Sequence, residues 1–175
     1  MSNTADAIMD AAERRIRIGG FNGFSFRDIA AETGIKSSSV HYHFPTKENL
    51  VAAIIHRYTE REIKIIDAKV ATGANAIKVW TRAFRNTLHS QEHMCPCLVL
   101  AVTNRDLPAK VVAEYQLFFK TCIQRLMASG LTQKRASHVL STITGAMVVA
   151  NAINDLSAYD RATADLMREP DAGTT

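Results

Sequence analysis

One spaced pattern, a small residue followed by Gly-Ile and then Val, constrains the fold of this 175-residue chain most strongly. Ala30 is small enough for a second helix to cross closely above the first. Gly34 stands where a tight turn between two helices needs a left-handed backbone. Ile35 and Val40 then anchor the second helix on the first. The spacing predicts a helix-turn-helix, a motif that presents its second helix to the major groove of DNA.

The segment that follows this turn is polar and poorly suited to burial. The three consecutive serines at 37–39 favour a helix only weakly, but their small hydroxyls can approach phosphates and base edges. His41, Tyr42 and His43 then place three hydrogen-bonding aromatic side chains in a row. Taken singly, the serines could be a solvated cap and His43 a packed core residue. Their coincidence at fixed spacing with the turn favours DNA binding.

Helical signals dominate the rest of the chain, and the alternation typical of strands appears over no useful length. Ile8, Ala12 and Ile16 recur at helical spacing and predict the buried face of a first helix. Ser25 and Asp28 predict a capping box at the start of the second. We therefore predict an all-α fold of about nine helices, a three-helix helix-turn-helix domain followed by a helical bundle. Beyond the motif, helices are expected over about residues 47–71, 75–90, 97–104, 108–130 and 132–156, with Ser157 capping a last short one.

Composition excludes several classes of protein. An apolar content of 47% and a charged content of 22% are ordinary for a globular chain and too apolar for disorder. No window reaches about 18 uninterrupted apolar residues, so no membrane partner is expected. The first ten residues carry acids where a signal peptide would carry bases and an apolar run, which predicts a cytoplasmic protein. Three cysteines are too few for a disulfide framework.

The net charge of +4 permits a nucleic-acid partner without requiring one. Residues 1–50 hold six Lys or Arg and six Asp or Glu, so the segment that contains the motif has no net charge. Residues 51–90 hold seven bases and three acids. DNA binding must therefore rest on particular residues rather than on bulk charge.

An enzyme is the main alternative class of protein. The sequence contains no Gly-rich phosphate loop, no nucleophile elbow and no carboxylate pair in a plausible cleft, so neither catalysis nor a cofactor is expected. A metal-responsive sensor stays open as an alternative, because two histidines and two cysteines place four potential ligands within nine residues. Most such clusters without two Cys-x-x-Cys pairs are coincidental, so no metal site is assigned. The residues concerned are His89, His93, Cys95 and Cys97.

A thiol-responsive sensor acting through Cys95 and Cys97 is a second open alternative. Proline favours the first position of a helix, so Pro96 predicts a helix start with Cys95 as its cap. A thiol at this end faces unpaired backbone N–H groups and the positive end of the helix dipole, which favours the reactive thiolate. The opposing interpretation is that each cysteine is a small buried apolar residue.

Residues 34–48 resemble the signature of the TetR family of transcriptional regulators. They contain the aromatic-His-Phe ending, followed by proline, a hydroxyl cap and the Lys-Glu pair that opens a long helix. The resemblance covers residues 1–50 or so, and the rest of the chain fits the family in helix number and length. His41 departs from the pattern because the family usually has tyrosine there, and Tyr42 is expected to share its phosphate contact.

The resemblance implies a regulator, expected to be a repressor, that binds double-stranded DNA as a homodimer. A two-fold protein matches a two-fold site, so the operator is expected to be palindromic. Arg27 would reach a base or a phosphate from the second helix, and Lys47 would pair with a phosphate at the N-terminus of the long helix. The other implied DNA contacts are Lys36, base edges at Ser37, Ser38, His41 and Tyr42, and phosphates at Ser39 and His43.

The same resemblance implies two domains, a DNA-binding domain over residues 1–46 and a domain for effector binding and dimerisation over residues 47–175. Wide apolar faces on the later helices would form an ordinary bundle core or would line a cavity between helices. TetR-like proteins bind their effector in such a cavity, which suits a small apolar or amphipathic molecule. The candidate effector-binding residues are Trp80, Phe84, Cys95, Cys97, Tyr115, Phe118, Phe119, Cys122 and Met147.

Small and branched residues are frequent in the helix expected over residues 132–156. Close approach of helices needs such residues, and a two-fold four-helix interface in the dimer would use them. Internal packing of the bundle is the alternative use. The residues concerned are Ala136, Ser141, Thr144, Gly145, Ala146, Val149, Ala150 and Ala152.

Overall fold

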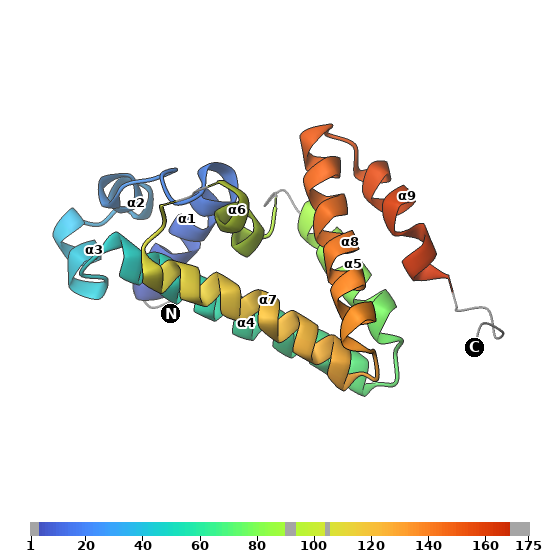
Figure 1. Cartoon of the computed structure of the whole chain (residues 1–175). Helices are drawn as coiled ribbons and strands as arrows, with labels where there is room; N and C mark the ends of the chain where they lie inside the picture. Colours follow the sequence, from blue (N-terminus) through green and yellow to red (C-terminus); the bar gives the residue numbers. More distant parts are fainter. Residues whose placement is uncertain (1–3, 90–93, 104–105, 169–175) are drawn as a thin grey trace. The chain divides into compact units, whose positions relative to one another are not determined.

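The computed structural model describes residues 4–89, 94–103 and 106–168, and every regular element in these ranges is an α-helix (Figure 1). No strand forms among them, so the predicted all-α fold of about nine helices is confirmed. In the same ranges, no helix combines the length and the apolar character that a bilayer span requires. The helices are α1 (Thr4–Gly19), α2 (Phe26–Thr33), α3 (Ser37–His43), α4 (Lys47–Ala71), α5 (Ala76–His89), α6 (Pro96–Thr103), α7 (Ala109–Ala128), α8 (Gln133–Ala152) and α9 (Leu156–Met167).

The chain forms two compact units. The first unit contains α1, α2, α3 and α6, together with α4 as far as Glu62 and α7 as far as Lys120. The second unit contains α5, α8 and α9 with the remaining parts of α4 and α7. These units describe how the chain packs in space. The division into a DNA-binding domain and an effector domain at residue 46 concerns function, and it stays a prediction.

The first three helices share one apolar core. Ile8, Ala12 and Ile16 of α1 are fully buried, as their helical spacing predicts. Ile29 of α2 and Val40 of α3 are also fully buried, and the three helices contact one another in pairs. Complete burial of each isoleucine contributes about 1.5–3 kcal/mol, so this short apolar set fixes the position of α3.

The turn between α1 and α2 depends on the absence of a side chain at residue 23. A Cβ added to Gly23 would lie 2.7 Å from the Cα of Gly19 and 2.9 Å from its carbonyl carbon. We expect Gly23→Ala to lower the free energy of unfolding by about 1–3 kcal/mol, since backbone atoms must move to relieve the overlap. Urea unfolding measures the difference. The matched control is Gly19→Ala, where a Cβ meets nothing within 4 Å, and equal losses in both variants would contradict the prediction.

The second unit is built on the packing of α5, α8 and α9. Trp80 of α5 is 1% exposed and Tyr159 of α9 is fully buried. The Tyr159 hydroxyl donates to the backbone carbonyl of Thr81 at 2.9 Å, which satisfies the polar atom of a buried ring. Burial raises the pKa of this hydroxyl above its usual range. At the surface, Arg85 and Asp160 join α5 to α9 through two hydrogen bonds of 2.5 and 2.8 Å.

The small residues of α8 divide between the inside and the outside of the second unit. Ala136, Ala146 and Ala150 are buried in the unit, so for these three the alternative of internal packing holds. Gly145 and Val149 lie on the exposed side of the same helix. Only the exposed members are therefore available to another chain.

The predicted cap of the last helix is wrong by two residues. α9 begins at Leu156, and Asp155 rather than Ser157 is its N-cap. The Asp155 carboxylate accepts a hydrogen bond from the Ser157 backbone N–H at 2.9 Å. Either side chain is a good cap, but Asn154 with φ of 51° turns the chain one residue before Asp155. The carboxylate thereby meets the free N–H groups first, and its charge is favourable at this end of the helix.

Candidate nucleic-acid interface

The turn of the helix-turn-helix has the geometry that its residues predict. Ser25 accepts a hydrogen bond from the Asp28 backbone N–H at 3.3 Å, and Asp28 accepts one from the Ser25 N–H at 2.7 Å, so the capping box is confirmed. The Ser25 hydroxyl also donates to the Asp28 carboxylate at 2.7 Å, and this bond together with that from the Ser25 N–H holds the pKa of Asp28 below its usual range. α2 ends at Gly34, whose φ of 69° and ψ of 24° are left-handed. The Ile35 N–H returns to the carbonyl of Ala30 at 3.0 Å and closes the turn.

α3 is attached to the protein through few side chains. Val40 is its only buried residue, and the helix ends where the Phe44 N–H bonds the Val40 carbonyl at 2.8 Å. Tyr42 is 84% exposed. The His41 ring lies edge-on against Phe26 of α2 with 4.7 Å between centroids, which orients the imidazole. The exposed surface of this segment carries Lys36, Ser38, His41 and Tyr42 among the sequence-predicted contacts, while Ser37, Ser39 and His43 are half-buried.

Two arginines near this surface are paired within the protein. Glu32 of α2 accepts hydrogen bonds from Arg14 at 2.9 Å and from Arg15 at 3.0 Å, both in α1. The hydrogen bond from Arg14 is the largest cause that holds the pKa of Glu32 below its usual range. Ion pairs between the residues that the structure describes involve neither Arg27 nor Lys36, and both side chains are exposed. Their charges can therefore face an anion.

Lys47 opens α4 but turns its ammonium toward the loop between α1 and α2. Its Nζ donates to the backbone carbonyl of Phe24 at 2.5 Å. The same atom lies 4.9 Å from the ring centroid of Phe21 and 4.5 Å from that of Phe24. Burial lowers the pKa of Lys47. The sequence did not predict this placement of the ammonium. An ammonium has three N–H donors and the carbonyl takes one, so donors remain for a second acceptor.

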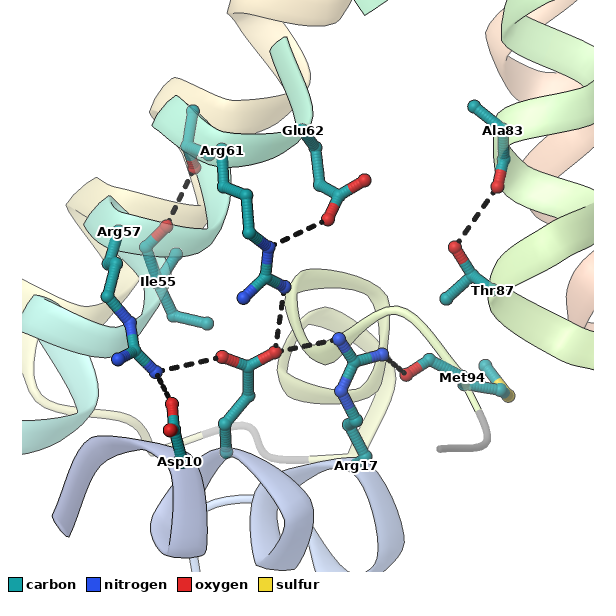
Figure 2. A network of polar contacts seen from close by, with 11 residues as sticks. Asp10, Arg17, Ile55, Arg57, Arg61, Glu62, Ala83, Thr87 and Met94 are labelled. Carbon is teal, nitrogen blue, oxygen red and sulfur yellow. Dashed lines mark hydrogen bonds and ion pairs between the residues drawn. The ribbon is translucent and has the colours of Figure 1, made fainter. Parts of the chain in front are cut away.

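Arginines around a buried carboxylate connect α1 with α4 and with Met94, which lies two residues before the start of α6. Figure 2 labels Arg17, Arg57, Arg61 and Met94 of this network. Glu13 accepts hydrogen bonds from Arg17 at 2.7 Å, from Arg61 at 3.1 Å and from Arg57 at 3.3 Å. Arg17 also donates to the backbone carbonyl of Met94 at 3.1 Å. Burial raises the pKa of Glu13, but the arginines outweigh it and the pKa lies below its usual range. Sequence reasoning missed this network, although the Glu13–Arg17 spacing of four residues was a visible signal.

The nine candidate effector-binding residues are distributed over both units. Tyr115 and Phe119 are half-buried and the other seven are buried. In the first unit the Phe118 ring packs against Tyr58, with 5.8 Å between centroids, and against Phe119, with 5.3 Å. The effector role of the nine residues stays a prediction. Cys95, Cys97, Tyr115, Phe118 and Phe119 belong to the first unit, and Trp80, Phe84, Cys122 and Met147 belong to the second.

Two surface depressions of the second unit contain none of these nine residues. One is lined by the turn between α8 and α9, with Asn151 and Asn154, and by Leu88 of α5. The other is lined by the turn between α4 and α5, with Asn75, and by Leu131. Both are open to solvent and neither is an apolar cavity of the kind that the sequence predicts.

The possible metal ligands are only partly described. His93 and the side chain of His89 lie outside the described residues. Within the described ranges, no three His, Cys, Asp or Glu side chains are grouped closely enough to hold a metal ion. Cys95 and Cys97 are buried and form no disulfide. α6 begins at Pro96, which confirms the predicted helix start.

Residues 8–54, which span the helix-turn-helix and the start of α4, match the model of a family described as bacterial regulatory proteins, tetR family. A TetR-family transcriptional regulator from Agrobacterium tumefaciens is 27% identical, with a TM-score of 0.85 over 93% of this chain and 94% of its own. A TetR transcriptional regulator from Legionella pneumophila is 27% identical, with a TM-score of 0.86 over 95% and 96% of the two chains. The regulatory protein TetR from Rhodobacter sphaeroides has the same fold at 15% identity, with a TM-score of 0.80 over 91% and 95%. No curated protein matches the chain.

Proposed function

Because the chain belongs to the TetR family of transcriptional regulators, we propose that it is a repressor that binds a palindromic operator as a homodimer. A small apolar or amphipathic effector releases it from the operator. In this role it acts by binding rather than by catalysis, and it works in the cytoplasm, where its DNA target lies. The observation that carries the proposal is the exposed polar face of α3.

The face of α3 is suited to the major groove because its polar side chains are held in place without being buried. Val40 anchors the helix in the core, and the Phe26 ring contacts the ring of His41 edge-on. Tyr42 is 84% exposed and combines a flat apolar ring with a hydroxyl that can donate or accept. We assign base edges to Ser37, Ser38, His41 and Tyr42, and phosphates to Ser39 and His43.

Phosphate contacts supply the part of the affinity that does not depend on base sequence. Arg27 near the start of α2 and Lys36 at the start of α3 are exposed charged residues. Lys47 is assigned to a phosphate at the N-terminus of α4, since its remaining N–H donors and the helix dipole act on the same oxygen atoms.

Salt titrations of DNA binding test these roles. Lys47→Ala should weaken binding to operator and unrelated DNA by the same factor, and should reduce the slope of log affinity against log salt by about 0.9, because one phosphate contact is lost. Tyr42→Ala should instead change the preference between operator variants and leave the slope unchanged. Lys64→Ala is the matched control, since it removes an exposed lysine further along α4. If Lys47→Ala keeps the slope of the parent, its ammonium serves only the Phe24 carbonyl and the phosphate role is wrong.

An exposed stripe on α8 is the proposed dimer interface. It consists of Ser141, Gly145, Val149 and Ala152, which share one face of the helix, and of the C-cap residue Ile153, and all five are exposed. Its apolar members expose much of their surface to solvent, 54% for Val149 and 57% for Ile153. A Cβ at Gly145 meets nothing within 4 Å, so the helix is open to close approach there. We call this set the α8 stripe.

Release from DNA requires an effector that prefers the form of the dimer that cannot bind the operator. Equal affinity for both forms would change nothing, and moving the equilibrium from about 1:99 to about 99:1 needs a preference of roughly 10⁴-fold. The proposed effector is a small apolar or amphipathic molecule because the candidate residues of each unit include large buried rings, Phe118 in the first unit and Trp80 in the second.

A further inference from the structure

Two histidines of α3 lie in the segment that the proposed function places against DNA. The His41 ring meets the Phe26 ring with 4.7 Å between centroids, and the His43 ring meets the Tyr42 ring with 5.3 Å, both edge-on. His41 is exposed and His43 is half-buried. These contacts orient the rings, and no hydrogen bond within the described part of the chain takes up a ring nitrogen of either one. Both imidazoles are therefore open to a proton and to an acceptor on DNA.

Within the described ranges, neither imidazole forms an ion pair with a carboxylate. α3 packs on α1 and α2 and precedes α4, and the acids of α1, α2 and the first turn of α4 are Asp6, Asp10, Glu13, Asp28, Glu32 and Glu48. Those of α1 pair with Arg57 of α4, Asp28 bonds Ser25, and Glu32 bonds arginines of α1. Hydrogen bonds hold the pKa of Asp28 and that of Glu32 below the usual range, so both carboxylates remain ionised above about pH 5.

Cations around α3 oppose a further positive charge while DNA is absent. Arg27 of α2 and Lys36, the N-cap of α3, are exposed, and Lys47 of α4 directs its ammonium to the Phe24 carbonyl. The α1 arginines, which are paired with acids, are Arg14, Arg15 and Arg17. Like charges disfavour protonation of an imidazole, whereas the dense row of phosphates on DNA favours it. DNA therefore stabilises the protonated rings more than the free protein does.

We propose that His41 and His43 are proton-binding sites of the DNA complex, so that the protein takes up protons when it binds its operator and binds more tightly as pH falls. Histidine is the side chain whose charge changes between about pH 5 and 8. A protonated imidazole carries two N–H donors. His43 then donates to a phosphate oxygen, and His41 donates to an acceptor on a base edge, such as N7 or O6 of guanine. This inference rests on the DNA-binding function proposed above.

The size of the effect follows from proton linkage. Where the complex holds an imidazole proton more tightly by one pKa unit, operator affinity rises about tenfold as pH falls through the two values. The proposed dimer brings four such rings to the operator, so a gain of about 10⁴-fold is expected between about pH 8 and about pH 5.5, roughly 100-fold from each pair of equivalent rings. The gain is complete below the imidazole pKa of the free protein and absent above that of the complex. In acid, each ring that meets a phosphate should also steepen the dependence of affinity on salt by about 0.9.

Operator affinity of the full-length protein, measured across this pH range at several salt concentrations, tests the inference. His41→Gln and His43→Gln each replace the ring by a neutral amide, and each should remove about 100-fold of the pH-dependent gain. The double variant should bind equally at both ends of the range. Of the single variants, only His43→Gln should also remove the extra salt dependence in acid, because His41 is assigned to a base edge. His56→Gln is the matched control, since His56 lies on α4 beside Glu60 and Glu114, and it should keep the pH profile of the parent.

The outcomes separate this inference from the proposed function. Equal operator affinity of the parent at both ends of the pH range overturns the inference while the proposed function stands. A gain that persists in the double variant places the protons elsewhere and also overturns it. A protein that binds no operator at any pH overturns the proposed function. If the double variant binds too weakly to measure, calorimetry on the parent and the single variants decides. Buffers with different enthalpies of ionisation then count the protons taken up, and an unchanged count in both single variants overturns the inference.

Discussion

Replacing Val149 with arginine is expected to abolish the dimer and to weaken operator binding by about 100- to 10,000-fold. Val149 is 54% exposed at the centre of the α8 stripe, where a second copy of the helix is proposed to approach. An arginine there would bring two like charges together across the two-fold axis and desolvate both. Each helix-turn-helix would then bind its half-site alone, without the high effective concentration that the partner provides.

Sedimentation measures the mass of the variant, and a gel-shift titration measures its affinity. Met127→Arg is the matched control, because Met127 is 40% exposed on α7 and lies outside the α8 stripe. The control should remain a dimer with the operator affinity of the parent. A dimeric Val149→Arg would exclude the α8 stripe as the interface, and a monomer that binds operator at full strength would exclude the bivalent mode of binding.

Replacing Glu13 with glutamine is expected to lower the free energy of unfolding by about 3–5 kcal/mol, the usual cost of removing one partner from a buried ion pair. The amide is nearly the same size as the carboxylate, so packing is retained. Arg17, which is 5% exposed, would lose the charged partner of its 2.7 Å ion pair. The matched control is Glu62→Gln, because Glu62 pairs with Arg61 nearer the surface and should cost less than about 1 kcal/mol. Denaturant unfolding of the three proteins measures both values, and a loss below about 1 kcal/mol for Glu13→Gln would show that the network is not important for stability.

The same variant changes how stability depends on pH. The pKa of Glu13 is lower in the folded protein than in the unfolded chain, so its contribution is present above the unfolded pKa. That contribution is lost as pH falls through the folded pKa, because protonation neutralises the carboxylate. The difference in free energy of unfolding between the parent and Glu13→Gln should therefore be largest at neutral pH. It should shrink in acid, where Glu13 of the parent becomes protonated and neutral like the glutamine.

Local structure was predictable from the sequence wherever one residue type has one strong backbone preference. Gly34 takes the left-handed turn, Ser25 and Asp28 form the reciprocal cap, and Pro96 opens α6. These assignments depend on neighbours within a few residues. The start of α9 was harder, since both Asp155 and Ser157 can cap a helix and only the turn at residue 154 decides between them.

Contacts between distant helices were not predictable in the same way. Glu13 and Arg17 are four residues apart, but the contacts of Glu13 with Arg57 and Arg61 span 44 and 48 residues. Likewise, Lys47 has the sequence position of a phosphate ligand, and only the fold shows that its ammonium meets the Phe24 carbonyl. Helical periodicity identifies the faces of α8, but the packing of neighbouring helices decides which face is inside.

The attachment of α3 through a single buried residue has an evolutionary consequence. Substitutions at the other six positions of Ser37–His43 leave the common core of α1, α2 and α3 intact, because Val40 alone contributes to it from this helix. Single substitutions on α3 can therefore change the preferred operator sequence with little effect on the stability of the fold. Duplicated copies of such a gene can acquire separate targets without passing through an unfolded ancestor.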